Sequence, residues 1–193
     1  MPKIFTEAQK AEIRIALLDA GQQALEQKSY KRVAVDELVQ AAGIAKGTFY
    51  HFFPSKEAFF YALLQRIKQD NRRGLLDLFR SGIPSGEALQ ACLYNRYTRM
   101  KSVYAYFPPE DLETLLAAIP PEQQTADDSL DFAALVGKTI RPLTRLETET
   151  IVGMFNILGL AAANCHSLSI TGYEPAMAVF CRTMADYILG GAA

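Results

Sequence analysis

Residues 33–60 read VAVDELVQAAGIAKGTFYHFFPSKEAFF and contain two short helical patterns on either side of a glycine. In the first pattern, apolar residues recur at the spacing of one helix face: Val35, Leu38, Val39 and Ala42. Gly43 is expected to end this helix, because glycine adopts the left-handed conformation beyond a helix without steric cost. A second helix is expected over 45–52, because Pro54 disfavours a helical conformation in the residue before it. Ser55 is then a natural cap for a third helix.

The second of these helices presents different chemistry on its two faces. Helical spacing puts three apolar side chains on its packing side: Ala45, Phe49 and Phe52. Its other side carries a cation, a glycine, a phenol and an imidazole: Lys46, Gly47, Tyr50 and His51. The cation, phenol and imidazole can bind phosphate oxygens, and the glycine lets backbone approach backbone. Thr48 can touch a base edge, and Lys56 adds charge beside the N-terminus of the third helix. This pattern predicts a helix that lies in a groove of DNA.

The alternative is a helical hairpin buried in an ordinary bundle, with these polar side chains merely exposed to solvent. The sequence disfavours it, because a helix as short as residues 45–52 is not stable unless its surroundings hold it in place. A DNA-binding role explains both the length and the composition of this helix.

The run AAGIAKGTFYHFFPSKEAFFYALL, residues 41–64, resembles the DNA-binding motif of TetR-family transcriptional repressors. In that motif a glycine turn is followed by Lys-Gly-Thr-aromatic-Tyr-His-aromatic-Phe and then by Ser-Lys-Glu. The resemblance extends over residues 1–70, and beyond them it is one of length, helicity and order of elements. It implies that the DNA-contacting positions are Lys46, Gly47, Thr48, Tyr50, His51 and Lys56. It also implies packing positions for Phe49, Phe52 and Phe53.

Position 34 departs from the family pattern. Members commonly have a threonine or serine there, which caps the first helix of the motif and touches a phosphate, whereas this chain has Ala34. We therefore expect the cap and one phosphate contact to be missing, unless Lys31 or Arg32 supplies the charge.

Charge is distributed unevenly along the 193 residues. Residues 1–73 carry 12 Lys and Arg against 8 Asp and Glu, whereas residues 74–193 carry 8 against 13. The basic part contains the motif, and a dimer would double its excess. A chance distribution of charges is the alternative, so the asymmetry supports DNA binding only together with the motif. With 50% hydrophobic residues, the chain is expected to fold as one domain or two small ones.

The sequence predicts a cytoplasmic protein without a membrane segment. Its N-terminus, MPKIFTEAQKAEI, lacks the apolar core of a secretion signal. Residues 151–163 are the most apolar stretch, and these 13 residues are too few to span a bilayer. The cysteines have no paired spacing, so free thiols in a reducing compartment are expected at Cys92, Cys165 and Cys181.

Helical patterns dominate the chain and predict an all-α fold. Besides the two motif helices, helices are expected over residues 7–27, 56–80, 87–106, 109–118, 131–136, 145–167 and 174–189, and a brief extended link over 31–35. We predict an N-terminal three-helix DNA-binding domain with a helix-turn-helix, residues 1–55, and a C-terminal helical ligand-binding and dimerisation domain, residues 56–193. The boundary is soft within residues 50–75, because the helix that starts at Lys56 passes from one region into the other as a rigid connector.

The last two predicted helices are rich in apolar residues, the first of them nearly all round, as expected for a surface that a second subunit covers. The candidate interface residues are Phe155, Leu158, Ala162, Met177, Phe180 and Met184. TetR-family members also dimerise in this region. A twofold axis would let two recognition helices read the half-sites of a palindromic operator about 34–36 Å apart. The alternative is burial of these helices within a single chain.

The second region also has aromatic, methionine and amide side chains suited to an apolar or aromatic small molecule. The candidate effector residues are Tyr94, Tyr97, Met100, Tyr104, Met154, Asn156 and His166. Plain core packing is an equally good interpretation of each of them. TetR-family members commonly bind such a ligand, and the resemblance implies a repressor that a small effector releases from DNA.

Catalysis has little support in the sequence, and no cofactor or metal is expected. Cys165 and His166 are adjacent, but neighbours on a helix point about 100° apart and cannot face each other as nucleophile and base. The chain has 2 histidines and no clustered metal-ligand spacing or phosphate-binding loop. A further alternative is an all-helical small-molecule-binding or protein-interaction module without DNA binding. Salt dependence distinguishes a DNA-binding protein from such a module, because DNA binding weakens steeply as ionic strength rises.

Overall fold

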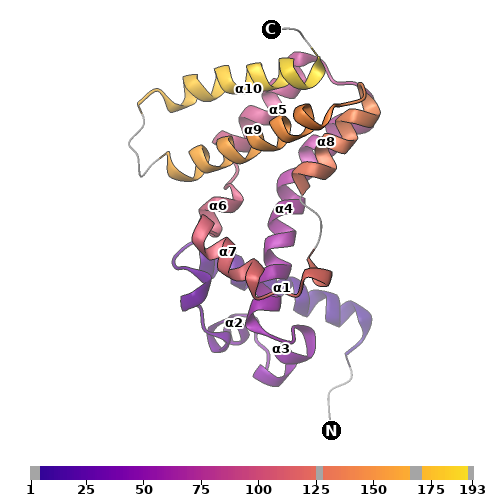
Figure 1. The fold of residues 1–193 in the computed structure, drawn as a ribbon. Coiled ribbons are helices and arrows are strands. Elements are labelled where there is room, and N and C mark those ends of the chain that lie inside the picture. Colours follow the sequence, from indigo (N-terminus) through magenta and orange to yellow (C-terminus); the bar gives the residue numbers. More distant parts are fainter. Residues whose placement is uncertain (1–4, 125–127, 166–170, 191–193) are drawn as a thin grey trace. The chain divides into compact units, whose positions relative to one another are not determined.

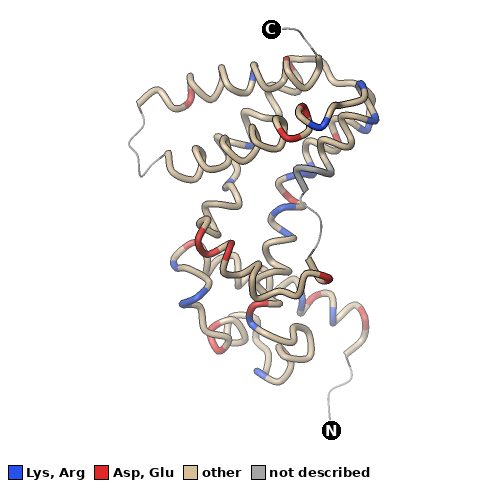
Figure 2. The backbone as a smooth tube through the Cα atoms, in the orientation of Figure 1, with Lys and Arg blue, Asp and Glu red and all other residues tan. Residues whose placement is uncertain are grey.

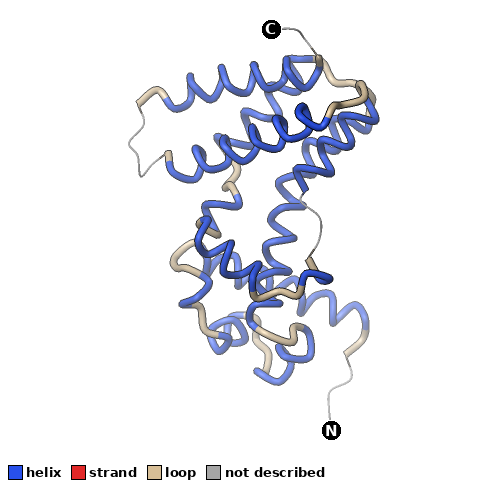
Figure 3. Tube along the Cα trace, viewed as in Figure 1, coloured by secondary structure: helices blue, strands red, loops and turns tan. Residues whose placement is uncertain are grey.

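The computed structural model describes residues 5–124, 128–165 and 171–190, and all regular structure within these ranges is helical (Figure 1; Figure 3). The predicted all-α class is confirmed. The chain divides into two compact units. The first comprises Met1–Arg66 with Tyr106–Gln124, and the second comprises Ile67–Ala105 with Thr125–Ala193.

The first unit is built largely from the helices near the N-terminus. Their bounds are α1 Glu7–Leu25, the 3-10 turn η1 Tyr30–Arg32, α2 Val35–Ala41, α3 Lys46–Phe52 and α4 Lys56–Arg80, of which the last contributes residues to both units. Thr6 caps α1 as a reciprocal pair with Gln9: its hydroxyl accepts from the Gln9 N–H, and the Gln9 side chain accepts from the Thr6 N–H. Helix α2 packs against α1 and α3.

Aromatic rings fill the interior of this unit. Phe49 from α3 and Phe59 and Phe60 from α4 are fully buried, and the ring centroids of Phe49 and Phe59 lie 5.4 Å apart. Gly21 of α1 packs directly on this cluster, because a Cβ added there would lie 2.6 Å from the Phe59 ring. The absence of a side chain at this position lets α1 approach α4 closely. The cluster therefore holds α3 against the other helices of the unit.

Residues 106–124 complete the first unit, although they follow the whole of α5 in the chain. This segment contains α7 Pro109–Ala117 and the 3-10 turn η2 Pro121–Gln123. Phe107 is fully buried, and its ring centroid lies 6.2 Å from that of Tyr30 and 6.5 Å from that of Phe60. The functional division at residue 55 stays a prediction, but by packing this later segment belongs with the N-terminal helices.

The second unit contains the C-terminal part of α4 and a helical bundle. The other elements are α5 Gly86–Thr98, α6 Val103–Tyr106, α8 Asp128–Thr139, α9 Arg145–Asn164 and α10 Tyr173–Leu189. Helix α5 packs against α9 and α10, and α8 packs against α9 (Figure 1). The core is apolar and includes Leu75, Phe79, Leu89, Leu93, Phe132, Val136, Ile151, Phe155, Met177, Cys181, Met184 and Ile188. Each long helix thus has one face committed to this core.

Two tyrosine hydroxyls tie the helices of this bundle together. The Tyr97 hydroxyl donates to the carbonyl of Phe155 at 3.2 Å, and the Tyr173 hydroxyl donates to the carbonyl of Tyr97 at 2.9 Å. Burial raises the pKa of Tyr97 far above its ordinary value and raises the pKa of Tyr173 to about 12. Both phenols therefore remain protonated donors at neutral pH, and they link α5 to α9 and α10.

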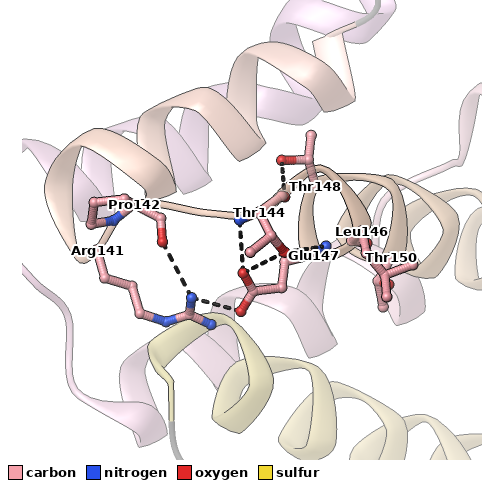
Figure 4. Close-up of polar contacts among 7 residues, drawn as sticks. All are labelled: Arg141, Pro142, Thr144, Leu146, Glu147, Thr148 and Thr150. Carbon is pink, nitrogen blue, oxygen red and sulfur yellow. Dashed lines mark hydrogen bonds and ion pairs between the residues drawn. The ribbon is translucent and has the colours of Figure 1, made fainter.

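The start of α9 is fixed by a local polar network (Figure 4). The Thr144 hydroxyl accepts from the Glu147 N–H at 3.2 Å, and the Glu147 carboxylate accepts from the Thr144 N–H at 2.8 Å. Arg141 adds an ion pair with Glu147 at 2.7 Å. Hydrogen bonds from the Thr144 backbone and side chain, together with Arg141, lower the pKa of Glu147 to about 2. The carboxylate is therefore ionised wherever the protein is near neutral pH.

Helix α9 has 20 residues, more than its apolar stretch suggests, and by length and composition alone it could cross a membrane. Core helices of soluble proteins can have the same length and apolar composition. Ile151, Phe155 and Leu158 on one face of α9 are buried in the second unit, and Arg145 and Glu149 lie in its first turns. One face of α9 thus packs in the core of the second unit.

The predicted helix over residues 87–106 is wrong in its extent. Helix α5 ends at Thr98, and α6 begins at Val103. The Ser102 hydroxyl accepts from the Tyr104 N–H at 3.3 Å, and this side-chain contact starts the new turn.

Two smaller elements also differ from the prediction. The stretch 31–35 is not simply extended, because η1 occupies Tyr30–Arg32 and the Ser29 hydroxyl accepts from the Lys31 N–H at 3.2 Å. The helix predicted over 131–136 is longer and forms α8.

Candidate nucleic-acid interface

A tight turn at Gly43 joins α2 to α3, as the sequence predicts. Gly43 has φ of 66°, in the left-handed region that favours glycine, and the Ile44 N–H donates to the Val39 carbonyl at 3.0 Å. Helix α3 ends at Phe52, and Phe53 takes an extended conformation ahead of Pro54. The helix-turn-helix predicted from local sequence is therefore present.

The polar face of α3 points to solvent. The exposed residues of this face are Lys46, Gly47, Tyr50 and His51, and Thr48 is half-buried beside them. The Tyr50 ring is 47% exposed although it is a large aromatic side chain. A Cβ added at Gly47 would meet no atom within 4 Å, so the backbone there is open to an approaching molecule. Four of the six predicted DNA-contacting residues thus form one accessible surface, which we call the α3 face.

The packing side of α3 differs from the prediction at one residue. Phe49 is fully buried, Phe53 is 2% exposed and Phe52 is half-buried. Ala45 is instead exposed, because it is the extended N-cap residue that precedes α3 rather than a member of its first turn. Arg14 of α1 covers the Phe53 ring, with its guanidinium carbon 4.8 Å from the ring centroid.

Lys46 is engaged by an acidic residue of α2. Its ammonium lies 2.9 Å from the Asp36 carboxylate, and both side chains are exposed, 53% and 71%. The hydrogen bond to Asp36 and the charge of that group raise the pKa of Lys46. Because exposed ion pairs are weak, Lys46 can exchange this partner for a phosphate.

Lys56, the sixth predicted contact, occupies a different position from the α3 face. It is half-buried, its ammonium donates to the Lys31 carbonyl at 2.9 Å, and burial lowers its pKa. The Ser55 hydroxyl accepts from the Ala58 N–H at 3.0 Å, which gives α4 the predicted cap. Lys56 thus braces the η1 turn against the start of α4.

As expected from the sequence, position 34 provides no side-chain cap for α2. Ala34 precedes α2 with extended backbone and makes no side-chain hydrogen bond to the helix. Of the two residues that could supply charge instead, Lys31 forms an ion pair with Asp111 at 2.9 Å, whereas Arg32 is exposed. Arg32 is therefore the better candidate for an additional phosphate contact near α2.

The sequence does not predict the contact between α7 and the η1 turn. Asp111 of α7 is 6% exposed; it accepts a hydrogen bond from the Ser29 hydroxyl at 2.6 Å and pairs with Lys31. Burial alone would raise the pKa of Asp111, but the contacts with Ser29 and Lys31 outweigh it, and the pKa is lowered. No pattern within residues 25–35 points to a partner so distant in the chain.

Basic and acidic residues are interspersed along the N-terminal helices of the first unit (Figure 2). Lys28 pairs with Glu37 at 2.6 Å, in addition to the two lysine pairs described above. The positive excess of this region is therefore partly neutralised in the free protein, and DNA binding would have to compete with these contacts.

The residues predicted to form a dimer interface separate into two groups. Phe155, Leu158, Met177 and Met184 are buried in the core of their own chain, whereas Phe180 is 57% exposed and Ala162 is half-buried. The same two helices also expose apolar side chains outside the predicted set: Leu146, Ile157 and Val179. The interface itself stays a prediction, and its best-placed residues are the exposed ones.

The predicted effector residues are likewise divided by burial. Tyr97 is buried, Met100 is exposed, and four others are half-buried: Tyr94, Tyr104, Met154 and Asn156. Tyr104 lies against Gly159 of α9, where an added Cβ would be 3.2 Å from its ring. His166 lies outside the described residues, as does any geometry of the Cys165 and His166 pair. Among the side chains that the structure describes, no group of three or more His, Cys, Asp or Glu could hold a metal ion.

Comparison with known proteins gives a match in the region of the α3 face. Residues 17–63 match the family model of bacterial regulatory proteins, tetR family. The transcriptional repressor NemR of Escherichia coli K12 is 39% identical over 66 residues, which cover 34% of this chain and 33% of NemR. The transcriptional regulator EthR of Mycolicibacterium smegmatis is 45% identical over 52 residues, which cover 27% of this chain and 24% of EthR. The chain thus matches a third or less of the length of these relatives.

Solved structures extend the likeness in fold beyond residue 63. The reduced form of E. coli NemR has a TM-score of 0.64 at 19% identity, over 89% of this chain and 96% of NemR. A TetR-family transcription regulator from Marinobacter aquaeolei has a TM-score of 0.59 at 18% identity, over 94% of this chain and 98% of its own. At these identities the likeness concerns the fold, and it includes the helices of both units.

Proposed function

We propose that this chain, whose residues 17–63 match the family model of bacterial regulatory proteins, tetR family, is a repressor of transcription that binds DNA as a homodimer. The observation that supports this most directly is the α3 face. A short helix held by a buried aromatic cluster presents a lysine, an open glycine, a phenol and an imidazole to solvent. These groups suit phosphate oxygens and close backbone approach.

A homodimer accounts for the exposed apolar residues of the last two helices. Ile157 is 67% exposed, Val179 64% and Phe180 57%, each far more than a buried core residue. Exposed large apolar side chains of this kind are typical of subunit interfaces. Paired by a twofold axis, two copies of α3 would read the two halves of a palindromic operator, with half-sites about 34–36 Å apart.

Release by a small molecule would act through α4. This helix contributes residues to both units, so a ligand that alters its C-terminal part has a covalent route to the helices that hold α3. Such a ligand lowers DNA affinity only if it binds the DNA-free conformation more tightly. In this proposal the second unit binds the effector and the first unit binds the operator.

Selection of bound sequences from random double-stranded DNA tests the proposal directly. The full chain should enrich a palindromic site, and fluorescence anisotropy on that site should show affinity that falls steeply with salt. If no sequence is enriched and binding to random DNA is also absent, the alternative of a helical module without DNA binding is supported instead.

A matched pair of lysine variants connects the activity to the α3 face. Lys46→Ala should weaken specific and non-specific DNA binding alike and lower the salt slope by about one unit per subunit. Lys138→Ala, at an exposed lysine of α8, should leave both quantities unchanged. A changed sequence preference with an intact slope would mean that Lys46 reads bases rather than phosphate.

A further inference from the structure

Arg96 of α5 is a half-buried cation surrounded by aromatic rings in the second unit. Its guanidinium carbon lies 5.5 Å from the ring centroid of Phe155 and 5.9 Å from that of Tyr97. It also donates to the backbone carbonyl of Asn71 on α4. The side chain is therefore placed where α4, α5 and α9 meet, and it is held there by a carbonyl and two π faces.

Arg96 has no acidic partner among the side chains that the structure describes. Other arginines of the same unit do: Arg141 pairs with Glu147 at 2.7 Å and Arg145 with Glu149 at 2.8 Å. A guanidinium has five N–H donors in a planar fork that matches a carboxylate. The hydrogen bond to Asn71 and a contact with the Tyr97 hydroxyl leave part of that capacity for another acceptor.

The stretches around Arg96 are strongly basic, in contrast to the acidic balance of residues 74–193 as a whole. Residues 67–73 and 95–101 contain one acidic residue, Asp70, and six basic ones: Lys68, Arg72, Arg73, Arg96, Arg99 and Lys101. The two stretches adjoin, because the Asn71 side chain donates to the Lys101 carbonyl at 3.4 Å. Their combined field favours an anion at this place.

Apolar and aromatic groups of α5, α6 and α9 lie in the same unit as this cation. Tyr104 packs on Gly159 of α9, and the buried Tyr97 is bonded to the carbonyl of Phe155. Half-buried Tyr94 and Met154 pack against the same core. A molecule that engages Arg96 would thus place an anionic group at the guanidinium and a hydrophobic body against rings.

We propose that the effector is a small organic anion, a carboxylate on an aromatic or apolar body, and that Arg96 binds its charged group. This inference rests on the proposed function, in which the second unit binds the effector. It narrows the apolar or aromatic ligand expected from the sequence to an acidic one. A structural role for Arg96 alone, or a contact of this basic region with DNA phosphate, gives different results in the test below.

Isothermal titration of the full chain with matched acid and amide pairs tests the proposal. The probes are benzoate and benzamide, 2-naphthoate and 2-naphthamide, and octanoate and octanamide. In at least one pair the shared aromatic or apolar group should fit the site. In that pair the carboxylate should bind about 10- to 100-fold more tightly than the amide, the range expected for a charge-assisted bidentate contact. Equal affinity within every pair, including no binding by either member, overturns the proposal.

Three arginine variants assign the preference to one residue. Arg96→Gln should remove the preference for the acid, and Arg96→Lys should retain a smaller one, because it keeps the charge but loses the planar fork. Arg145→Gln, at an exposed arginine of α9 that pairs with Glu149, should behave as the unaltered protein. Circular dichroism checks folding, and if Arg96→Gln does not fold, Arg96→Lys carries the test. An undiminished preference in the folded variants overturns the role of Arg96.

DNA binding measured on the same variants separates this inference from the proposed function. Arg96→Gln should bind the selected operator as tightly as the unaltered protein when no probe is present, because Arg96 lies outside the α3 face. Weaker operator binding by this variant would favour the contact with DNA phosphate and overturn the effector role. If the unaltered protein binds no DNA yet retains the preference for acids, the proposed function fails while the anion site stands.

Discussion

The ammonium of Lys46 lies 2.9 Å from the carboxylate of Asp36, so a residue of α2 holds the cation that is predicted to meet DNA. Both side chains are exposed, and such pairs contribute little to stability. The carboxylate nevertheless competes with phosphate for Lys46 and repels phosphate itself.

Asp36→Asn should therefore raise DNA affinity severalfold at low salt, and the gain should shrink as salt increases. The same change should slightly lower the free energy of unfolding, because Asp36 lies in the first turn of α2, where a negative charge is favourable. Anisotropy and urea unfolding measure the two effects. Asp77→Asn, which removes a similar exposed pair with Arg80, is the control and should leave DNA affinity unchanged. A weaker complex for Asp36→Asn would mean that the pair positions Lys46 for binding.

Tyr50→Phe should weaken operator binding by about 1 kcal/mol, or somewhat more because phosphate is charged. The ring is 47% exposed, so removal of the hydroxyl leaves the packing intact, and the unfolding curve should not move. Tyr187→Phe in α10 is the matched control. Unchanged affinity in Tyr50→Phe would exclude this hydroxyl as a phosphate contact.

Gly47→Ala should have opposite effects on stability and on DNA binding. Alanine is favoured over glycine in a helix by about 0.5–1 kcal/mol, and the added methyl meets no atom within 4 Å, so the thermal midpoint should rise. The methyl would stand between α3 and the DNA backbone, so affinity should fall. Gly74→Ala in α4, where a Cβ makes ordinary contact with Cys92, should stabilise without loss of binding. Retained affinity in Gly47→Ala would show that no close backbone approach occurs there.

Asp111→Asn should lower the free energy of unfolding by about 1–2 kcal/mol at neutral pH, since a buried charged acceptor loses its ionic contact. The pKa of Asp111 is lowered in the folded protein, so its contribution exists above the ordinary value of 3.8 and is lost as pH falls through the folded value. Urea unfolding of both proteins from pH 7 down to about pH 3 should therefore show the difference shrinking below about pH 4.

The neighbouring exposed carboxylate provides the control for that series. Glu110→Gln changes a charge in the same first turn of α7 without a comparable partner and should cost less. A difference between Asp111→Asn and the unaltered protein that persists unchanged in acid would show that shape, rather than ionisation, is responsible.

Ile157→Asp should convert a dimer into a monomer, because it buries a charge in the proposed interface. Light scattering after size exclusion should give the mass of two chains for the unaltered protein and of one for the variant. Ile83→Asp alters a residue of similar exposure, 60% against 67%, in the turn after α4 and should remain dimeric. A monomeric mass for the unaltered protein would contradict the homodimer at once.

Local features of the first unit were predictable from the sequence. The left-handed Gly43, the Ser55 cap and the missing cap at Ala34 each depend on a few adjacent residues. The separation of Phe49 from Tyr50 follows from helical periodicity alone. Such features are decided within one or two helical turns, and periodicity and backbone stereochemistry act at that range.

Partners that lie far apart in the chain were not predictable. Ser29 and Asp111 are separated by 82 positions, and nothing in either local sequence specifies the other. The many apolar residues of α9 and α10 concealed which face lies inward, so Met177 and Phe180 received the same interpretation although one is buried and the other exposed. Arg96 lacked a motif, and its significance depends on rings contributed by another helix.

The return of residues 106–124 to the first unit limits how the N-terminal helices can be transplanted. A fragment that ended at Arg66 would keep the whole α3 face, but it would uncover Tyr30 and Phe60 where Phe107 now packs. It would also leave Ser29 without its buried acceptor. A chimeric regulator that joins these helices to a foreign effector domain would also need the α7 segment. The first unit therefore cannot be exchanged by a fusion at a single position in the chain.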